Sequence, residues 1–182
     1  IIDFSHFTSL EDILEYAVDN KTPVIIATTG HTKEQTDKIL KASSEIPILK
    51  TTNTSLGVSI VNEILSYATK LLRGFDIELI EKHHNRKIDA PSGTANTMLE
   101  VIRESLDKEM ELVYGREGHK KREENEIGVH VIRAGNIVGE HSVIFSKGDE
   151  VIEIKHEALS RRIFADGAAD AANKLINKKN GL

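Results

Sequence analysis

The sequence predicts an α/β protein in which a parallel-sheet domain is followed by a mixed α+β domain with a largely antiparallel sheet. Short apolar runs alternate with helical periodicity over the first third of the chain. Alternating, hairpin-like strand patterns dominate later. The length of 182 residues exceeds one average domain without reaching two. We therefore expect a first domain at residues 1–56, a second at residues 57–160, and a closing segment at residues 161–182 that returns to the first.

The first third of the chain has the order strand, helix, strand, helix, strand, which predicts a partial Rossmann-like parallel sheet with right-handed crossovers. The strands are expected at residues 1–4, 24–27 and 47–49. Thr8 with Glu11 forms a candidate capping box before the first helix, and Thr32 with Gln35 forms one before the second. Ile39 and Leu40 are expected on the inner face of the second helix.

After Gly57 the sequence pattern no longer alternates short strands with helices. A long amphipathic helix is expected to end at Gly74. Its predicted buried face consists of Ile60, Val61, Ile64, Leu65, Ala68 and Leu71. An alternating strand at residues 76–81 and a helix from Ser92 follow. Further strands are expected at residues 111–114, 128–133, 137–146 and 150–157, the last two joined by a hairpin turn, before a helical tail from Phe164.

Composition excludes several classes of protein. With no cysteine, the chain has no disulfide, thiolate zinc site or cysteine nucleophile. No apolar run approaches the ~18 residues of a membrane helix. A net charge of −5 and an aromatic content of 4% disfavour nucleic-acid binding. We expect a cytoplasmic protein acting on small molecules, without nucleic-acid or membrane partners. Because an apolar run opens the chain at Ile1, we also expect the sequence to begin partway through a domain.

Small polar residues follow all three strands of the first region. They are Ser5-His6, Thr28-Thr29-Gly30 and residues 51–55, TTNTS. Ligands of open α/β sheets bind at the carboxyl ends of the strands, so these loops are candidates for a ligand site. The alternative is that they are ordinary turn formers.

The residues with the clearest chemistry lie between positions 83 and 95. Four groups that are or can be cationic, from His83 to Lys87, precede a helix start marked by Pro91 and Ser92. The first-turn N–H groups of Gly93 and Thr94 would add an anion site at the positive end of the helix dipole. A carboxylate or phosphate fits such a pocket, and a histidine there can exchange a proton at neutral pH.

Two other interpretations of this segment stay open. A basic run is most often a solvated turn. His83, His84 and Asp89 could instead bind a metal, but adjacent histidines on an extended segment point to opposite sides, so we expect no metal site. The glycine spacing does not match a P-loop.

Residues 83–95, HHNRKIDAPSGTA, preceded by ELIE at 78–81, closely resemble the signature of the 4-hydroxy-tetrahydrodipicolinate (dihydrodipicolinate) reductases. Further matches follow in order along the chain: DFS at 3–5, TTG at 28–30, NxSxGV at 53–58, REG at 116–118, RAG at 133–135, VGEH at 138–141, SR at 160–161 and FA at 164–165. The resemblance covers the whole chain.

The resemblance implies an oxidoreductase of lysine and diaminopimelate biosynthesis. In that family NADH or NADPH delivers a hydride to a cyclic unsaturated dicarboxylate, giving tetrahydrodipicolinate. By position, His83 and Lys87 are the implied catalytic residues. The implied substrate contacts are His84, Lys87, Gly93 and Thr94. The family also implies a homotetramer.

The implied cofactor contacts are Ala27, Thr28, Thr29, Thr51, Thr52, Asn53, Thr54, Arg161 and Phe164. Two positions depart from the family pattern: Ala27 replaces a usual glycine, and Thr54 replaces a residue that is often Phe or Met. The family's glycine-rich diphosphate loop and its ribose-reading residue would precede residue 1. The choice between NADH and NADPH therefore stays open.

Two further functions remain as alternatives. One is a related NAD(P)-dependent reductase of another small anionic substrate. The other is a non-catalytic module that binds a dicarboxylate.

Overall fold

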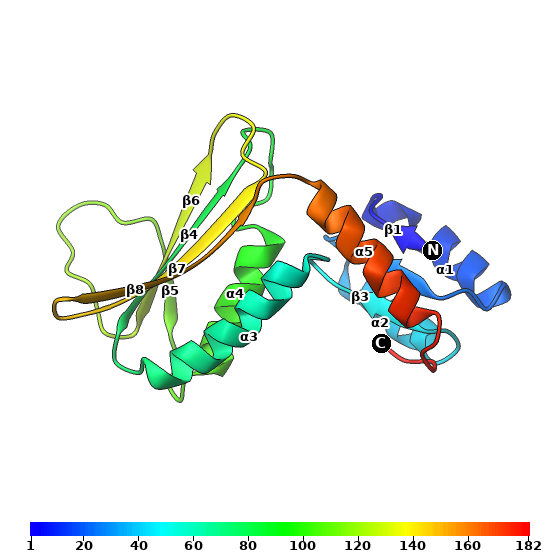
Figure 1. The fold of residues 1–182 in the computed structure, drawn as a ribbon, viewed down its shortest axis with the longest axis horizontal. Coiled ribbons are helices and arrows are strands. Elements are labelled where there is room, and N and C mark those ends of the chain that lie inside the picture. Colours follow the sequence, from blue (N-terminus) through cyan, green and yellow to red (C-terminus); the bar gives the residue numbers. More distant parts are fainter. The chain divides into compact units, whose positions relative to one another are not determined.

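The computed structural model describes residues 1–182 as two compact units (Figure 1). The first contains residues 1–55 and 162–182, and the second contains residues 56–161. None of the helices combines the length and apolar character needed to cross a bilayer. The roles of these regions in cofactor and substrate binding stay predictions.

The first unit is built on a three-stranded parallel sheet in the order β1-β2-β3, which confirms the predicted parallel arrangement. Helices α1 and α2 cover one face of this sheet, and α5 packs against β2. Apolar side chains of the helices and the sheet form the core, and all three residues of β2 are buried in it. The elements are β1 (Ile2–Asp3), a 3-10 turn η1 (Phe7–Ser9), α1 (Leu10–Asp19), β2 (Val24–Ile26), α2 (Lys33–Ser43), β3 (Ile48–Lys50) and α5 (Arg162–Leu175).

The two predicted capping boxes have different outcomes. Thr32 and Gln35 form theirs, each side chain bonding the other's backbone N–H. The prediction for Thr8 and Glu11 is wrong, because Thr8 lies inside the 3-10 turn and its hydroxyl contacts His6 Nδ1 at 3.0 Å. The prediction for Leu40 is also wrong. Its side chain is 59% exposed, because α2 packs on the core with the neighbouring face of the helix, which contains Ile39.

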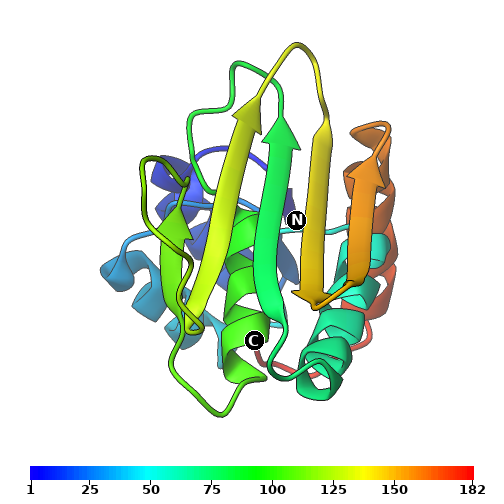
Figure 2. The same ribbon diagram turned by 90° about the vertical axis from the view of Figure 1, so that its left-hand side faces the viewer.

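The second unit packs two helices on one face of a five-stranded sheet, seen face-on in Figure 2 with α3 and α4 behind it. The strand order is β5-β6-β4-β7-β8. The mixed sheet is confirmed, but only two of its four pairs are antiparallel. The long connection between β5 and β6 brings the chain back to the end of the sheet where β5 begins, so β5 and β6 run parallel. The elements are α3 (Leu56–Leu71), β4 (Asp76–His83), α4 (Gly93–Glu104), β5 (Glu111–Tyr114), β6 (Glu126–Arg133), β7 (Gly139–Lys147) and β8 (Glu150–Ala158).

The face of α3 that packs on the core differs from the predicted one. The helix buries Val58, Leu65 and Thr69. Three residues of the predicted buried face, Ile60, Ile64 and Leu71, are 46–66% exposed. The apolar stripe of α3 is wider than its contact with this sheet and α4, so one edge of the stripe stays uncovered.

Gly167 of α5 lies directly against the backbone of the loop after β3. A Cβ at this position would be 1.9 Å from the carbonyl oxygen of Thr54. We expect Gly167→Ala to lower the free energy of unfolding by about 1–3 kcal/mol through overpacking, although alanine gains up to ~1 kcal/mol in helix propensity. Urea unfolding measures the change. Ala169→Gly, at an exposed position of α5, controls for propensity alone. A more stable Gly167→Ala variant would contradict the contact.

Candidate active site

The segment from β4 to α4 brings the predicted substrate residues onto one side of the second unit. His83 is the last residue of β4, and α4 begins at Gly93. Ser92 is the N-cap of α4, and its hydroxyl accepts a hydrogen bond from the backbone N–H of Ala95 at 3.2 Å. The loop between them is held by the turn after β6, where the N–H of Ala134 donates to the carbonyl of His83 at 2.9 Å.

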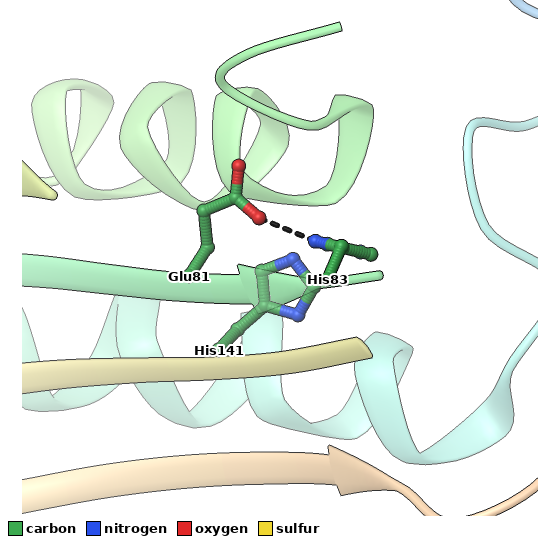
Figure 3. Close-up of side chains that lie close together, drawn as sticks. All are labelled: Glu81, His83 and His141. Atoms are coloured by element: carbon green, nitrogen blue, oxygen red, sulfur yellow. Dashed lines mark hydrogen bonds and ion pairs between the residues drawn. The ribbon is translucent and has the colours of Figure 1, made fainter. Parts of the chain in front are cut away.

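A buried carboxylate, Glu81, organises this segment (Figure 3). Strand alternation places Glu81 in the same register as the core residues Ile77 and Leu79, and its side chain is fully buried. Four hydrogen bonds surround the carboxylate. They come from His83 Nδ1, from Arg133 Nη1 at 3.1 Å and Nη2 at 2.8 Å, and from the N–H of Ser92 at 3.1 Å.

These contacts keep Glu81 ionised. Burial alone would raise the pKa of the carboxyl group, but hydrogen bonds from His83 and Arg133 and their positive charges outweigh it and lower the pKa to about 2. The buried carboxylate is therefore a permanent acceptor at neutral pH.

The ring of His83 is confined on its other sides by β7. The His141 ring meets it edge-on, with centroids 5.2 Å apart. Gly139 faces the far end of the ring, where a Cβ would be 3.2 Å from His83 Nε2. His141 itself is buried, and its Nε2 lies 2.9 Å from the hydroxyl of Ser92. This contact links β7 to the start of α4.

Three atoms of this cluster, from Glu81, His83 and His141, lie close enough together to hold a metal ion. This set differs from the His83, His84 and Asp89 set considered from the sequence. The guanidinium of Arg133 already donates a hydrogen bond to the carboxylate of Glu81, and its positive charge would repel a cation there. The arrangement fits a hydrogen-bonded proton site better than a metal site.

The cationic groups of the loop lie beside this network. Lys87 is largely buried and pairs with Asp89 at 2.7 Å. Burial, followed by the positive charges of Arg161 and Arg86, lowers the pKa of His84. Its Nδ1 is buried without a hydrogen-bond partner. Gly93 and Thr94 form the first turn of α4, and Thr94 is buried. The predicted substrate contacts thus lie in one segment, the loop after β4 and the first turn of α4.

In the first unit, the loops after the three strands are adjacent. The N–H of Thr51 donates to the carbonyl of Ile26 at 3.0 Å, joining the ends of β2 and β3. Thr28 is buried, and its hydroxyl donates to Asp3 at 2.8 Å. Thr54 donates to the carbonyl of Phe164 at 2.7 Å. The predicted cofactor contacts Ala27 to Thr29, Thr51 to Thr54 and Phe164 therefore gather at one edge, and Arg161 lies exposed in the second unit.

This edge also carries an unsatisfied polar atom. His31 Nε2 is buried without a partner, and burial followed by the charge of Lys50 lowers the pKa of the ring. Gly30 beside it has a positive φ of 86°. An unpartnered buried polar atom among threonine and backbone groups at the carboxyl ends of parallel strands fits a nucleotide-binding edge.

Family models match nearly the whole chain. The model described as "Dihydrodipicolinate reductase, N-terminus" matches residues 1–54, and "Dihydrodipicolinate reductase, C-terminus" matches residues 57–182. The chain belongs to the dihydrodipicolinate reductase family. This confirms the predicted family and, at family level, the predicted NAD(P)H-dependent oxidoreductase of lysine and diaminopimelate biosynthesis.

Two curated relatives of this reductase family span the entire chain. A 4-hydroxy-tetrahydrodipicolinate reductase of Brachyspira hyodysenteriae is 52% identical over 182 residues, which are 79% of its length. One of Clostridium novyi is 48% identical over 183 residues, which are 73% of its length. A solved dihydrodipicolinate reductase from Paenisporosarcina sp. TG-14 has a TM-score of 0.75 and 22% identity, covering 98% of this chain and 69% of its own. That likeness shows the shared reductase fold.

Three residues of this hydrogen-bonded cluster were not among the predicted site residues: Glu81, Arg133 and His141. Arg133 and His141 come from β6 and β7, and only the sheet register brings them next to β4. Glu81 could have been found from the sequence pattern. An acidic residue in the buried register of an alternating strand must have a partner, since an unpaired buried charge is costly.

His141 makes the stability of the second unit dependent on pH. Burial, and to a smaller extent the charge of His83, lowers the pKa of His141 from its ordinary value of 6.5 to about 4. Between these values the unfolded chain binds more protons than the folded one, so stability falls as pH decreases from 6.5 to about 4. The full loss is on the order of 3 kcal/mol.

Urea unfolding at a series of pH values tests this expectation. The natural protein should lose more free energy of unfolding across that interval than His141→Gln, which cannot titrate. Equal losses in the two proteins would show that the buried imidazole does not control this pH dependence.

Proposed function

We propose that this chain reduces 4-hydroxy-tetrahydrodipicolinate to tetrahydrodipicolinate with NADH or NADPH, and that His83 and Lys87 are its catalytic residues. One observation carries the proposal. A histidine bonded to a buried ionised carboxylate ends β4, and the loop from it to the positive end of α4 carries a lysine whose backbone N–H bonds the carbonyl of His84, the residue after that histidine, at 3.1 Å. This places a proton-transfer group next to a surface suited to carboxylates.

Substrate recognition follows from charge. A cyclic dicarboxylate carries two negative groups, and charge-assisted hydrogen bonds from Lys87, His84 and the first turn of α4 would bind them. Lys87 would exchange its present partner Asp89 for a substrate carboxylate. The relative from Paenisporosarcina is described as bound to dipicolinate, a flat dicarboxylate, which supports this class of ligand.

The reaction adds two hydrogens and releases the 4-hydroxyl as water. After the elements of water leave, the resulting double bond receives a hydride on one carbon and a proton on its neighbour. When bound, the reduced nicotinamide supplies the hydride. The protonated ring of His83 gives up its Nε2 proton to the substrate and returns to its neutral form, and solvent then restores that proton. Glu81 stabilises the ring while it is charged and keeps its hydrogen bond to Nδ1 when the ring is neutral.

The residues that would hold the cofactor are those gathered at the edge of the first unit: Ala27, Thr28, Thr29, Thr51, Thr52, Asn53, Thr54 and Phe164, with Arg161 from the second unit. The hydroxyls of Thr28 and Thr54 already bond within the protein. Their part in binding would therefore be to shape the loops rather than to donate to the cofactor.

We further propose that the protein is a cytoplasmic homotetramer. The sheet face opposite α3 and α4 carries no helix (Figure 2) and presents Ile80, Ile132, Ile144 and Val151. Ile132 and Val151 are 41% and 66% exposed. Ion-paired residues such as Lys82 and Glu140 lie among these apolar side chains, and a second copy of the chain would cover both. Sedimentation at increasing protein concentration should show assembly, and a monomer at every concentration would refute the tetramer.

A coupled assay tests the reaction. Aspartate semialdehyde and pyruvate are fed through the upstream synthase, and oxidation of NADH and NADPH by the natural protein is followed separately. Oxidation that depends on the synthase is expected, and its rates would also show which cofactor is preferred. No oxidation with either cofactor would overturn the proposal.

A further inference from the structure

We propose that Glu81 is a positioning residue that fixes the tautomer of His83, with the proton on Nδ1, so that Nε2 alone exchanges a proton with the ligand. The inference deepens the proposed function and rests on His83 being its proton-transfer group. Glu81 acts through His83 and does not touch substrate.

The donor and acceptor chemistry of the pair determines where the proton lies on His83. An ionised carboxylate can only accept hydrogen bonds. His83 Nδ1 bonds Glu81 Oε2, so Nδ1 must be the donor. In the neutral ring, Nε2 is then without a proton and serves as the acceptor. In the charged ring, Nε2 carries the proton that can be released.

Glu81 is itself immobilised. Arg133 binds both carboxylate oxygens and also donates to the carbonyls of Ile132 at 2.9 Å and Asp89 at 2.7 Å. Its own position is set because β6 pairs with β4 in parallel register, with Arg133 beside His83. The charge of Arg133 helps to hold the pKa of Glu81 near 2, so the acceptor persists at any working pH.

The same carboxylate also fixes the substrate side of the proposed site. Glu81 Oε1 accepts the N–H of Ser92, the N-cap of α4, at 3.1 Å. The hydroxyl of Ser92 is in turn 2.9 Å from His141 Nε2. One buried group therefore sets the ring of His83 relative to the helix start that would receive a substrate carboxylate.

A buried ion pair that serves only stability would have the same contacts, so the test must read the tautomer. In ¹⁵N-labelled natural protein, the ring nitrogens of His83 are assigned by NMR at a pH where the ring is neutral. A protonated Nδ1 and an unprotonated Nε2 are expected. A proton on Nε2, or a mixture of tautomers, would overturn the proposal without any variant having to fold.

Glu81→Gln then links the tautomer to turnover. Two fixed donors, Arg133 Nη2 and the N–H of Ser92, bond the Oε1 position, whereas Oε2 is bonded by Arg133 Nη1 and by His83 Nδ1, whose proton can move. The amide oxygen should therefore lie at Oε1, and the NH₂ group should face His83 Nδ1. Nδ1 would then become an acceptor, and the proton would move to Nε2. We expect kcat to fall roughly 10²–10⁴-fold while the affinity for dipicolinate is unchanged, as for wrong-tautomer variants of other histidine enzymes.

Glu78→Gln is the matched control. It makes the same chemical change on the same strand, where Glu78 pairs with His130 at 2.7 Å on the opposite face of the sheet. It should leave the His83 tautomer and kcat unchanged. If Glu81→Gln keeps the natural tautomer or the natural kcat, the inference is wrong. If the natural protein shows the tautomer but no reductase activity, the proposed function fails while the role of Glu81 toward His83 stands.

Discussion

Replacing His83 with alanine is expected to lower kcat by roughly 10²–10⁴-fold, the usual contribution of a general acid or base. The variant loses the only ring that is held by a buried carboxylate at the end of β4. The affinity for dipicolinate should change little, because the carboxylate contacts are assigned to other residues. Steady-state kinetics in the coupled assay and calorimetric titration with dipicolinate measure the two effects separately.

His119→Ala provides the control for this prediction. His119 is an exposed histidine in the loop between β5 and β6, and its removal should leave kcat unchanged. If His83→Ala retains near-natural turnover, another group supplies the proton and the proposed role of His83 is refuted.

Lys87→Ala is expected to reduce kcat over a similar range, roughly 10²–10⁴-fold, and in addition to weaken dipicolinate binding. Lys87 is assigned both to the reaction and to a substrate carboxylate, so its loss should raise KM as well as lower kcat. The combination separates it from His83→Ala, which should affect kcat alone. The same kinetic and calorimetric measurements apply.

The loop that carries Lys87 also supplies its control. Arg86 is exposed on the same turn and donates to Asn136 at 3.2 Å, so Arg86→Ala removes a positive charge without removing a proposed substrate contact. Its effect should be small. Equal losses in Lys87→Ala and Arg86→Ala would mean that general positive charge, rather than a specific lysine, supports the reaction.

Much of the fold could be predicted because its elements leave local patterns. The apolar run of β2, the alternation of β4 and the Thr32 capping box all depend on residues that are near one another in the sequence. The failures arose where tertiary packing decides. A 3-10 turn stands where the capping box at Thr8 was predicted. Leu40 and Ile64 are exposed because their helices pack on the core with other residues of the helix surface.

The site could be predicted only in part for the same reason. The catalytic candidates His83 and Lys87 and the substrate candidates His84, Lys87, Gly93 and Thr94 all lie within twelve residues of one another, and a resemblance to a family signature located them. Arg133 and His141 are 50 or more residues away in the sequence and reach His83 only through the register of β6 and β7. No local pattern encodes that register, so the hydrogen-bond network around His83 could not be predicted from the sequence.

The measurement that tests the central claim most directly follows the transferred hydrogen. The natural protein is given synthase-generated substrate with NADH or NADPH in which both hydrogens on the reactive nicotinamide carbon are deuterium, and the product is trapped and examined by mass spectrometry. Direct hydride reduction predicts tetrahydrodipicolinate that contains the deuterium of the cofactor. Product without that deuterium, or no product with either labelled cofactor, would contradict the account.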